Sequence, residues 1–432
     1  MQRFLWSKLS DADKSDALAR PAAISDASLM NSVRDILQSV KTGGDQAVLD
    51  LTEKFDGVRP TALRVNETEL KSAWDALPAK DKAAIDRAKA NIETFHTAQL
   101  PDEISIEIEP GVSCRRIPRA LDVVGLYVPG GTAPLVSTLL MLAVPAKVAG
   151  CSRRVVISPP SKDGTINSTV LAAAYRCDVT DVFIAGGAQA IAALAYGTDA
   201  IPKCAKIFGP GNAWVAAAKS IVAQEAGGPA IDMPAGPSEA MVLADADANP
   251  AFVASDLLSQ AEHDKVAQVI CVASSPAVAD AVDAAIASQL ATLPRKDIAT
   301  ASLGFGRMII ANSRTDILEI INAYAPEHLI IQLDNPKSYV VDIQNAGSIF
   351  LGPYTPESVG DYASGTNHTL PTYGAARAYS GITTESFMKY ISVQSLTAEG
   401  MLSLGPTVER LAELEGLDAH RRAVTLRLES LK

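Results

Sequence analysis

Short apolar runs and longer runs of helical periodicity alternate through the middle of this 432-residue chain. Each apolar run has the length of a buried strand, and continuous apolar strands are typical of parallel sheets that helices cover on both faces. The chain also exceeds one ordinary hydrophobic core, so it should divide into several units. These observations predict an α/β fold with two Rossmann-like parallel-sheet units, an N-terminal helical segment and a small C-terminal helical tail.

The N-terminal segment is expected to be helical and to end in a strand pair. Helical periodicity covers residues 25–40 and 79–99. Residues 104–108 then alternate apolar and polar side chains, and Pro110-Gly111 turns the chain. His96, near the end of the second helix, is interpreted as a surface or capping histidine.

The two central units repeat the same alternation of strands and helices. In the first unit, strands are predicted at 123–128, 154–158, 181–185, 206–208 and 240–244, and helices at 135–149, 167–175, 189–196 and 213–224. In the second unit, strands are predicted at 266–272, 308–311, 328–332 and 348–351, and helices from Pro250 to His263 and at 276–290, 315–323 and 336–344. A polar loop at 353–382 is too long for a passive connector.

The predicted boundaries follow from these patterns. The stretch from Thr407 to Lys432 contains two helices around Gly416, docked away from the body or onto another chain. The chain divides into an N-terminal helical segment with a strand pair (1–119), a first Rossmann-like unit (120–245), a second unit with the long polar loop (246–382) and a C-terminal tail (383–432).

Composition excludes several functional classes. The chain has 49 acidic and 38 basic residues and a net charge of −11, which disfavours nucleic acid and anionic membranes as partners. It has no apolar run long enough to span a bilayer, and residues 1–10 do not resemble a signal peptide, so a cytoplasmic location is expected. The 5 cysteines are scattered, without a C-x-x-C pair, and are interpreted as buried inert thiols, with a catalytic thiol as the alternative.

Three glycine-containing turns, 128–134, 186–189 and 208–212, each follow a predicted strand and open a helix. Such turns lie at the carboxyl ends of parallel strands, where α/β sheets bind ligands. Glycine there lets backbone N–H groups approach a phosphate at a helix N-terminus. The turns fit a dinucleotide or phosphorylated ligand, although G-x-G-x-x-G is absent; the alternative is tight turns without a ligand.

Several polar side chains stand out against apolar surroundings. Gln260 and His263 are three residues apart, so they project from the same side of a helix. Glu327 and His328 precede an apolar strand and could transfer protons. Gln260, His263, Asp361 and His420 would form a mixed nitrogen and oxygen site for one divalent ion, but their spacing alone does not establish it. The alternatives are a helix-end pair, an exposed strand edge and a solvated tail histidine.

Five longer segments carry a specific resemblance. From about residue 20 to the C-terminus, the chain resembles the histidinol dehydrogenase family. The segments are Phe208-Gly-Pro-Gly-Asn212-Ala, Ile231-Asp-Met-Pro-Ala-Gly-Pro-Ser238-Glu239, Asp256-Leu-Leu-Ser-Gln260-Ala-Glu-His263, Pro326-Glu327-His328-Leu-Ile and Gly360-Asp-Tyr-Ala-Ser-Gly-Thr-Asn-His368-Leu-Pro-Thr.

The resemblance implies a zinc- and NAD-dependent four-electron oxidation of L-histidinol through L-histidinal to L-histidine, the last steps of histidine biosynthesis, using two NAD. It also implies an intertwined homodimer with one zinc ion per subunit, in which the tail completes the partner's site. Carried over by matching positions, the zinc ligands are Gln260, His263, Asp361 and His420; the proton-transfer pair is Glu327 and His328; the substrate contacts are Ser238, Gln260, His263, His328, Asp361, Glu415 and His420; and the NAD contacts are Tyr127, Gln189 and Asn212.

The chemistry agrees with these assignments, because alcohol oxidation needs a base beside a nicotinamide and aldehyde oxidation needs activated water. We assign the base to His328 and water activation to Glu327. Three alternatives remain: a related NAD- and zinc-dependent dehydrogenase of another alcohol, such as a sulfonated diol; a zinc hydrolase in which Glu327 activates water; and a non-catalytic ligand-binding protein. The pair Glu415 and His420, suited to an amino-imidazole substrate, argues against the first.

Overall fold

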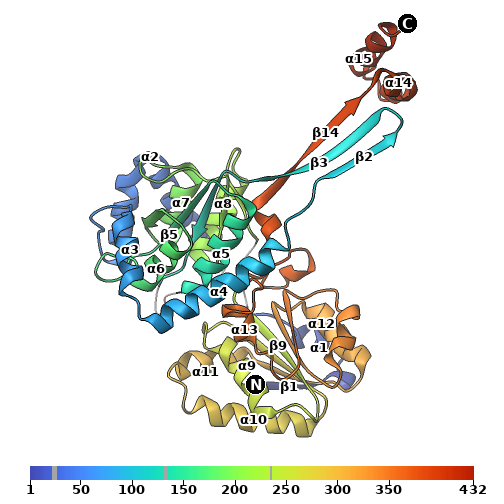
Figure 1. Ribbon diagram of the computed structural model, residues 1–432. Helices are drawn as coiled ribbons and strands as arrows, with labels where there is room; N and C mark the ends of the chain where they lie inside the picture. Colours follow the sequence, from blue (N-terminus) through green and yellow to red (C-terminus); the bar gives the residue numbers. More distant parts are fainter. Residues whose placement is uncertain (22–26, 131–134, 234–235) are drawn as a thin grey trace.

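The computed structural model describes residues 1–21, 27–130, 135–233 and 236–432. Two parallel sheets with helices around them form the body, and a three-stranded antiparallel arm carries the C-terminal helices outward (Figure 1). The predicted α/β class with parallel sheets is therefore confirmed. Within the described part of the chain, every helix is too short or too polar to cross a membrane.

The first sheet has five parallel strands in the order β6-β5-β4-β7-β8. β4, the first of these strands in the sequence, lies in the middle of the sheet. The next two strands, β5 and β6, add on one side of it, and the chain then crosses to add β7 and β8 on the other side. Such a reversal of direction marks the position where α/β sheets bind ligands. The strands are β4 (Val123–Tyr127), β5 (Arg153–Ser158), β6 (Asp181–Ile184), β7 (Lys206–Phe208) and β8 (Ala230–Ile231).

Alternate side chains of these strands enter two separate cores, one on each face of the sheet. Val124 and Leu126 pack in the core that contains α5, whereas Tyr127 and Val155 pack in the core that contains α7 and α8. Helix α5 is buried almost all round, which explains its continuous apolar sequence. The helices are α2 (Ala27–Asp56), α3 (Glu67–Ala76), α4 (Ala79–Thr97), α5 (Val136–Ala149), α6 (Ser168–Arg176), α7 (Gly187–Tyr196) and α8 (Ala213–Gln224).

The second sheet has six parallel strands and repeats the same order, β11-β10-β9-β12-β13, with β1 added at the edge beside β11. The strand predicted at 240–244 had been assigned to the first unit, but it is the central strand of this sheet; alternation along the chain does not reveal which sheet a strand joins. The strands are β1 (Gln2–Leu5), β9 (Glu239–Ala244), β10 (Gln268–Ala273), β11 (Arg307–Ile310), β12 (His328–Gln332) and β13 (Ser348–Leu351).

Residues 1–119 do not form a single N-terminal segment as predicted, because the first residues of the chain pair with the second sheet. Gln2 to Leu5 pair with Arg307 to Ile310, and the Trp6 side chain is buried in the core of that sheet. A four-residue edge strand of mixed polarity has no periodicity, so only its long-range pairing identifies it. The shorter elements that follow are η1 (Trp6–Lys8) and α1 (Asp11–Ala17).

Helices cover the second sheet on both faces, as they do the first. Two corrections apply: 336–344 contains a 3-10 helix, and the predicted loop at 353–382 contains the short helix α13. The elements are α9 (Pro250–Ala261), α10 (Pro276–Leu290), α11 (Lys296–Phe305), α12 (Arg314–Tyr324), η2 (Pro336–Asp342), α13 (Glu357–Tyr362), η3 (Ala375–Arg377) and η4 (Thr384–Phe387).

The arm joins two distant parts of the sequence. Its third strand was not predicted; it pairs antiparallel with β3 from Met388 opposite Ala120 to Leu396 opposite Val112. The tail helices lie at the outer end of the arm (Figure 1) and meet at Gly416, as expected, although the first begins earlier than predicted. The elements are β2 (Ile104–Glu109), β3 (Val112–Ala120), β14 (Met388–Leu396), α14 (Ala398–Leu414) and α15 (Asp418–Glu429).

His96 is buried, which corrects its interpretation as a surface or capping residue. Its Nδ1 lies 2.8 Å from the carbonyl oxygen of Ile92, and its own carbonyl oxygen accepts a hydrogen bond from Thr384. Burial lowers the pKa of His96, so the ring is held neutral. The sequence could not show this, because the segment that covers the end of α4 comes almost 300 residues later.

Candidate active site

The predicted proton-transfer pair lies at the amino end of β12, buried between the start of that strand and the start of β9. The Glu239 N–H donates to Glu327 Oε2 at 2.8 Å, and His328 Nδ1 lies 3.2 Å from the Glu239 carbonyl oxygen. A carbonyl can only accept, so Nδ1 carries the hydrogen of that contact. His328 Nε2 is buried without a hydrogen-bond partner in the part of the chain that the structure describes, and it lies 3.5 Å from Asp361 Oδ1.

The charges around this pair are strongly coupled. Burial raises the pKa of Glu327 to about 8, against the lowering effect of the His328 imidazolium. Burial alone would lower the pKa of His328, but the carboxylates of Glu357, Glu327 and Asp361 raise it to about 10. Three acidic side chains thus surround one imidazole, and a bound cation would favour their ionised forms.

Three ligand-type side chains converge beside His328. Atoms of His263, Glu357 and Asp361 lie within 4.8 Å of one another. His263 follows the end of α9, while Glu357 and Asp361 are four residues apart on α13 and share one face. His368 Nδ1 lies 2.9 Å from the Asp361 carbonyl oxygen, and its Nε2 lies 3.2 Å from Thr138 of α5, so His368 ties this loop to the first unit.

Unpartnered polar atoms indicate that this cluster fits a metal ion. Gln260 lies in the last turn of α9, three residues before His263. Its side-chain oxygen and nitrogen are both buried without a hydrogen-bond partner among the described residues. Glu357 Oε2 is in the same situation. Buried polar atoms of this kind are costly unless something binds them. Imidazole, amide and carboxylate donors together suit a divalent ion such as zinc.

Glu357 was missed by the sequence analysis. Burial raises its pKa to about 8, with His328 opposing the shift. Its position four residues before Asp361 would have marked it only if the six-residue helix α13 had been predicted within the polar loop. The i,i+4 spacing of Glu357 and Asp361 is therefore a local signal, but a helix of six residues is too short to be predicted from the sequence.

A single copy of the chain does not bring the two tail residues to this cluster. Glu415 directly follows the last residue of α14 and His420 lies in α15, and both side chains are exposed. Figure 1 shows these helices at the outer end of the arm, away from α9 and α13. Ser238, by contrast, directly precedes Glu239 at the amino end of β9, and the Glu239 backbone contacts both Glu327 and His328.

The predicted NAD residues gather at the carboxyl end of the first sheet. Tyr127 ends β4, and its hydroxyl accepts a hydrogen bond from the Gly187 N–H at 3.2 Å. Gln189 is buried in the first turn of α7. Asn212 caps α8 by accepting from the Trp214 and Val215 N–H groups at 3.1 and 3.2 Å. Of the first glycine turn, residues 131–134 lie outside the described residues.

Gly209 brings two of these turns into close contact. Its φ is +116°, and a Cβ at this position would lie 2.1 Å from the Tyr127 carbonyl oxygen, so only glycine fits. A buried ion pair holds it: Lys219 Nζ donates to the Gly209 carbonyl at 2.9 Å, and the Gly209 N–H donates to Asp232 at 2.8 Å. A cavity of about 240 Å³ lies beside the turn and is lined by Gly209, Gly211 and Val215, among others.

Comparison with known proteins agrees with this arrangement. A family model described as histidinol dehydrogenase matches residues 19–428. The chain belongs to the histidinol dehydrogenase family. It is an NAD-dependent oxidoreductase that acts on alcohol and aldehyde groups.

Similar members of the histidinol dehydrogenase family cover the whole chain. Histidinol dehydrogenase from Aliivibrio fischeri is 50% identical over 431 residues, which is 100% of this chain and 97% of the relative. The enzyme of that name from Vibrio parahaemolyticus is also 50% identical, covering 100% of this chain and 99% of the relative. The crystal structure of histidinol dehydrogenase from Elizabethkingia anophelis matches with a TM-score of 0.96 at 43% identity, covering 100% of this chain and 98% of that one.

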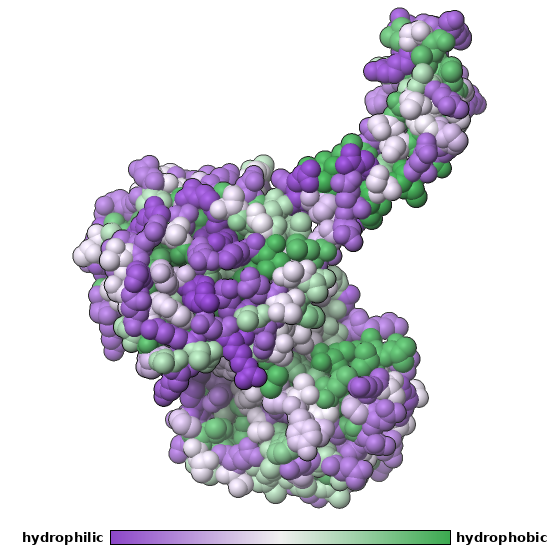
Figure 2. All heavy atoms as spheres, viewed as in Figure 1, coloured by the Kyte–Doolittle hydropathy of each residue, from purple (hydrophilic) through white to green (hydrophobic). Residues whose placement is uncertain are grey.

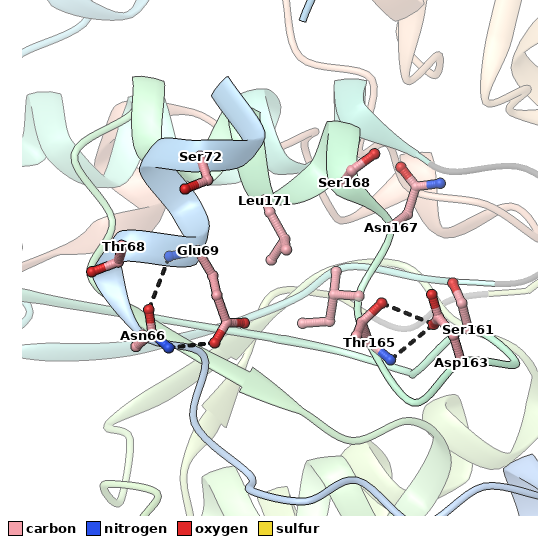
Figure 3. A pocket seen from close by; sticks show the side chains of 11 residues that line it. Asn66, Thr68, Glu69, Ser72, Ser161, Asp163, Thr165, Asn167, Ser168 and Leu171 are labelled. Carbon is pink, nitrogen blue, oxygen red and sulfur yellow. Dashed lines mark hydrogen bonds between the residues drawn. The ribbon is translucent and has the colours of Figure 1, made fainter. Parts of the chain in front are cut away.

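A separate polar cavity of this histidinol dehydrogenase family member lies away from the predicted residues. It has a volume of about 660 Å³ and lies between α3 and the loop before α6 (Figure 3). Asn66 bonds Glu69, and Asp163 accepts from Thr165 at 2.8 Å, so several of its polar groups already satisfy one another. It contains none of the site residues carried over from the histidinol dehydrogenase family.

The buried cysteines behave as inert thiols. Burial raises the pKa of Cys151 to about 11 and that of Cys177, Cys204 and Cys271 to about 12. Thiolates are therefore suppressed near neutral pH, as expected for structural cysteines in the cores of this histidinol dehydrogenase family member.

Proposed function

We propose that this enzyme oxidises L-histidinol through L-histidinal to L-histidine, the last steps of histidine biosynthesis, and reduces two NAD with one zinc ion per subunit. The observation that carries the proposal is the buried Glu327–His328 pair beside the cluster of His263, Glu357 and Asp361. Membership of the histidinol dehydrogenase family supports the same reaction.

Gln260, His263 and Asp361 of one subunit, with His420 of a second copy, would hold the zinc ion. When bound, the ion supplies positive charge that anchors the imidazole and amine of the substrate. The unpartnered amide of Gln260 and the close carboxylate and imidazole groups support this assignment. Ser238, His328 and Glu415 complete the proposed substrate contacts.

The first oxidation removes the hydroxyl proton and one hydride from the alcohol carbon. His328 Nε2, neutral once a bound cation offsets the carboxylates that raise the pKa of this imidazole, accepts the hydroxyl proton. Bound NAD would supply the hydride acceptor, which leaves the aldehyde. In the second oxidation a water molecule adds to the aldehyde while Glu327 accepts a proton. The resulting hydrate anion would transfer a hydride to the second NAD and become the carboxylic acid, which releases its remaining proton to solvent to give the carboxylate. The closeness of the Glu327 carboxyl group and the His328 imidazole supports this division of roles.

A homodimer with shared sites would bring the tail of each copy to the site of the other. The arm supports this, because large apolar side chains are exposed along it, and a contiguous apolar surface marks an interaction site. Figure 2 shows apolar residues gathered along the arm. Those exposed on the strands and helices of the arm include Ile104, Ile106, Ile108, Ile391, Leu396, Leu402, Leu411 and Leu414. A cytoplasmic location remains a prediction from the sequence.

The first experiment follows NADH formation with L-histidinol and, separately, with other amino alcohols and a sulfonated diol, before and after chelation. We expect two NADH per L-histidinol, loss of activity on chelation and recovery on adding zinc. One NADH per molecule, or a preference for another alcohol, would contradict the proposed substrate or stoichiometry. NAD-independent hydrolysis would favour the hydrolase alternative, and zinc retention without turnover would favour a binding protein.

Mixing two inactive variants tests the shared site. If each site takes His263 from one subunit and His420 from the other, a hybrid dimer of the His263→Ala and His420→Ala variants has one site with both substitutions and one site with neither. Random exchange of subunits should therefore restore roughly a quarter of the wild-type activity. If each site were built from one subunit, every hybrid site would carry a substitution and activity would not return. Zinc content of the separate variants gives the independent readout.

A further inference from the structure

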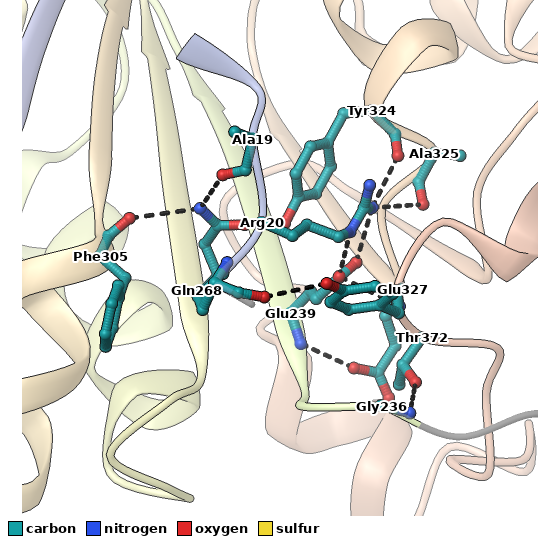
Figure 4. Close-up of polar contacts among 12 residues, drawn as sticks. Ala19, Arg20, Gly236, Glu239, Gln268, Phe305, Tyr324, Ala325, Glu327 and Thr372 are labelled. Carbon is teal, nitrogen blue, oxygen red and sulfur yellow. Dashed lines mark hydrogen bonds and ion pairs between the residues drawn. The ribbon is translucent and has the colours of Figure 1, made fainter. Parts of the chain in front are cut away.

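We propose that Arg20 and Glu239 are positioning residues, a buried ion pair that aligns Glu327 and His328 for proton transfer. This inference rests on the proposed function, because it assigns those two side chains to the reaction. Figure 4 shows the contacts of Arg20, Glu239 and Glu327.

The main chain of Glu239 contacts both members of the proton-transfer pair. Its N–H donates to Glu327 Oε2 at 2.8 Å, and its carbonyl oxygen lies 3.2 Å from His328 Nδ1. The first contact fixes the orientation of the carboxylate. The second places the hydrogen on Nδ1 and leaves Nε2 to face the reacting site. The position of a single peptide segment therefore sets the direction of two side chains.

That segment lies at the end of the strand pairing and needs another anchor. The β9–β12 ladder begins at Ala240 opposite His328, so Glu239 lies just outside it, although Glu239 is paired with Gln268 of β10 on the other side. The side chain of Glu239 supplies the additional anchor. Arg20 Nε bonds its Oε1, Arg20 Nη2 donates to its Oε2 at 3.0 Å, and the Tyr373 N–H donates to Oε1 at 3.0 Å.

Arg20 also holds the turn that leads into Glu327. Its Nη2 donates to the Tyr324 carbonyl oxygen at 2.7 Å, and its guanidinium lies 3.9 Å from the centre of the Tyr324 ring. Tyr324 ends α12, and Ala325 then adopts a left-handed φ of +56° before the chain reaches Glu327. One guanidinium thus links the start of β9 to the turn before β12, which are the two segments that carry the proton-transfer groups.

A second set of contacts fixes Arg20 itself. The Tyr324 hydroxyl donates to Gln268 Oε1 at 2.8 Å, and Gln268 Nε2 donates to the Ala19 carbonyl at 2.9 Å. The residue before Arg20 is therefore tied to the same sheet as Glu239. The network spans α12, β9, β10 and the segment after α1, and it reaches Glu327 through the Glu239 N–H (Figure 4).

Stability alone is a poor explanation for this ion pair. Replacing both charges of a buried pair with apolar groups is often neutral for folding, because desolvation offsets the attraction. The arginine fork is suited to holding a carboxylate in a defined orientation, which a lysine ammonium cannot do. Misplacing reacting groups by about 1 Å can cost ~10²-fold in rate, so positioning is the larger effect.

The test compares Glu239→Gln and Arg20→Lys with wild-type enzyme for kcat, for the KM of histidinol and of NAD, for zinc content and for Tm. We expect kcat to fall by ~10- to ~10²-fold, with each KM and the zinc content within about twofold of wild type. The more conservative Glu239→Asp should recover part of kcat if a charged carboxylate is what Arg20 holds.

Asp181→Asn is the matched control. Asp181 is also a buried carboxylate at the first residue of a strand, and it pairs with Arg64 at 3.0 Å and Arg153 at 2.9 Å. We expect this variant to lose stability while keeping kcat. The positioning role is wrong if Glu239→Gln and Arg20→Lys keep kcat, or if kcat falls only in step with Tm and zinc content. If the wild-type enzyme in the same assay does not oxidise histidinol, the proposed function fails instead.

Discussion

The two parallel sheets have the same strand order but place their candidate functional residues at opposite ends. In the first sheet, Tyr127 and Asn212 lie at the carboxyl ends of the strands, where helices begin. In the second sheet, His328 begins β12, and α9 returns to that amino end and finishes near His263. Strand order alone therefore does not locate a site.

Helix direction gives the physical reason for the difference. The N-terminus of a helix carries partial positive charge and free N–H groups, which suit a phosphate. The C-terminus carries partial negative charge and favours a cation. The carboxyl end of the first sheet therefore suits a dinucleotide, whereas the amino end of the second sheet, where α9 ends, suits a metal ion.

A buried ion pair supports the backbone in both regions. Lys219 and Asp232 hold both peptide groups of Gly209 at the predicted NAD turn. Arg20 and Glu239 hold the segment that contacts Glu327 and His328. In each case the charged pair bonds the segment that carries or contacts the residues proposed to meet ligand. The two regions therefore fix a non-regular backbone segment in the same way, although their proposed chemistry differs.

The largest expected effect separates the two proton-transfer roles within the second unit. His328→Asn should lower kcat for histidinol by ~10²–10⁴-fold, and Glu327→Gln should lower the oxidation of histidinal by a similar factor, because each removes a positioned acid–base group. Steady-state rates with histidinol and with histidinal as separate substrates measure this. NAD affinity should change little in either variant. An unchanged rate with histidinol in His328→Asn, or with histidinal in Glu327→Gln, would show that the substituted residue does not have the proposed role.

The second prediction tests the first unit alone. Gly209→Ala introduces a Cβ against the Tyr127 carbonyl at a positive φ, which should cost ~1–3 kcal/mol of unfolding free energy and raise the KM for NAD. Zinc content should stay at the wild-type level, because the metal cluster belongs to the other sheet. Urea denaturation and NAD titration of the rate provide the measurements.

Gly304→Ala is the control for that substitution, since a Cβ there meets no atom of the described residues within 4 Å and its φ is not positive. Its stability and KM should match wild type. Equal behaviour of the two alanine variants would show that Gly209 does not need to be glycine.

A smaller effect distinguishes a structural histidine from those of the site. The pKa of His96 is lowered by burial, so the folded state resists protonation there while the unfolded state protonates near the ordinary value. Stability from this group is complete at high pH and is lost as pH falls below about 6.5, by up to ~1.4 kcal/mol per unit. His96→Gln should therefore lose less stability than wild type between about pH 6.5 and 5. Parallel stability curves for the two proteins would contradict this.

The smallest effect concerns the cysteines. With pKa values of about 11 to 12, Cys151, Cys177, Cys204 and Cys271 should resist iodoacetamide near neutral pH in the folded enzyme. Mass spectrometry should find these four labelled only after denaturation, with activity unchanged by treatment of the native protein. Rapid labelling of any of them, with loss of activity, would revive the catalytic-thiol alternative.

Local sequence patterns predicted much of the body. The apolar run of α5 and the strand–turn–helix sequence around Gly209 were identified because side-chain periodicity and glycine turns report backbone conformation directly. The i,i+3 spacing of Gln260 and His263 predicted both on one side of a helix; Gln260 lies in α9, but His263 lies in the turn just past its end. The roles of these residues, however, came from the resemblance and not from their spacing.

Other features depended on contacts between distant segments. The edge strand β1 pairs with β11 across about 300 residues, β14 pairs in the arm with β3 from far earlier in the chain, and Arg20 bonds Glu239, which comes 219 residues later. Local periodicity specifies the conformation of a segment and which face it buries. Which segments then pair, and which charges meet in the interior, is decided by the burial of the whole chain, so only the tertiary structure revealed it.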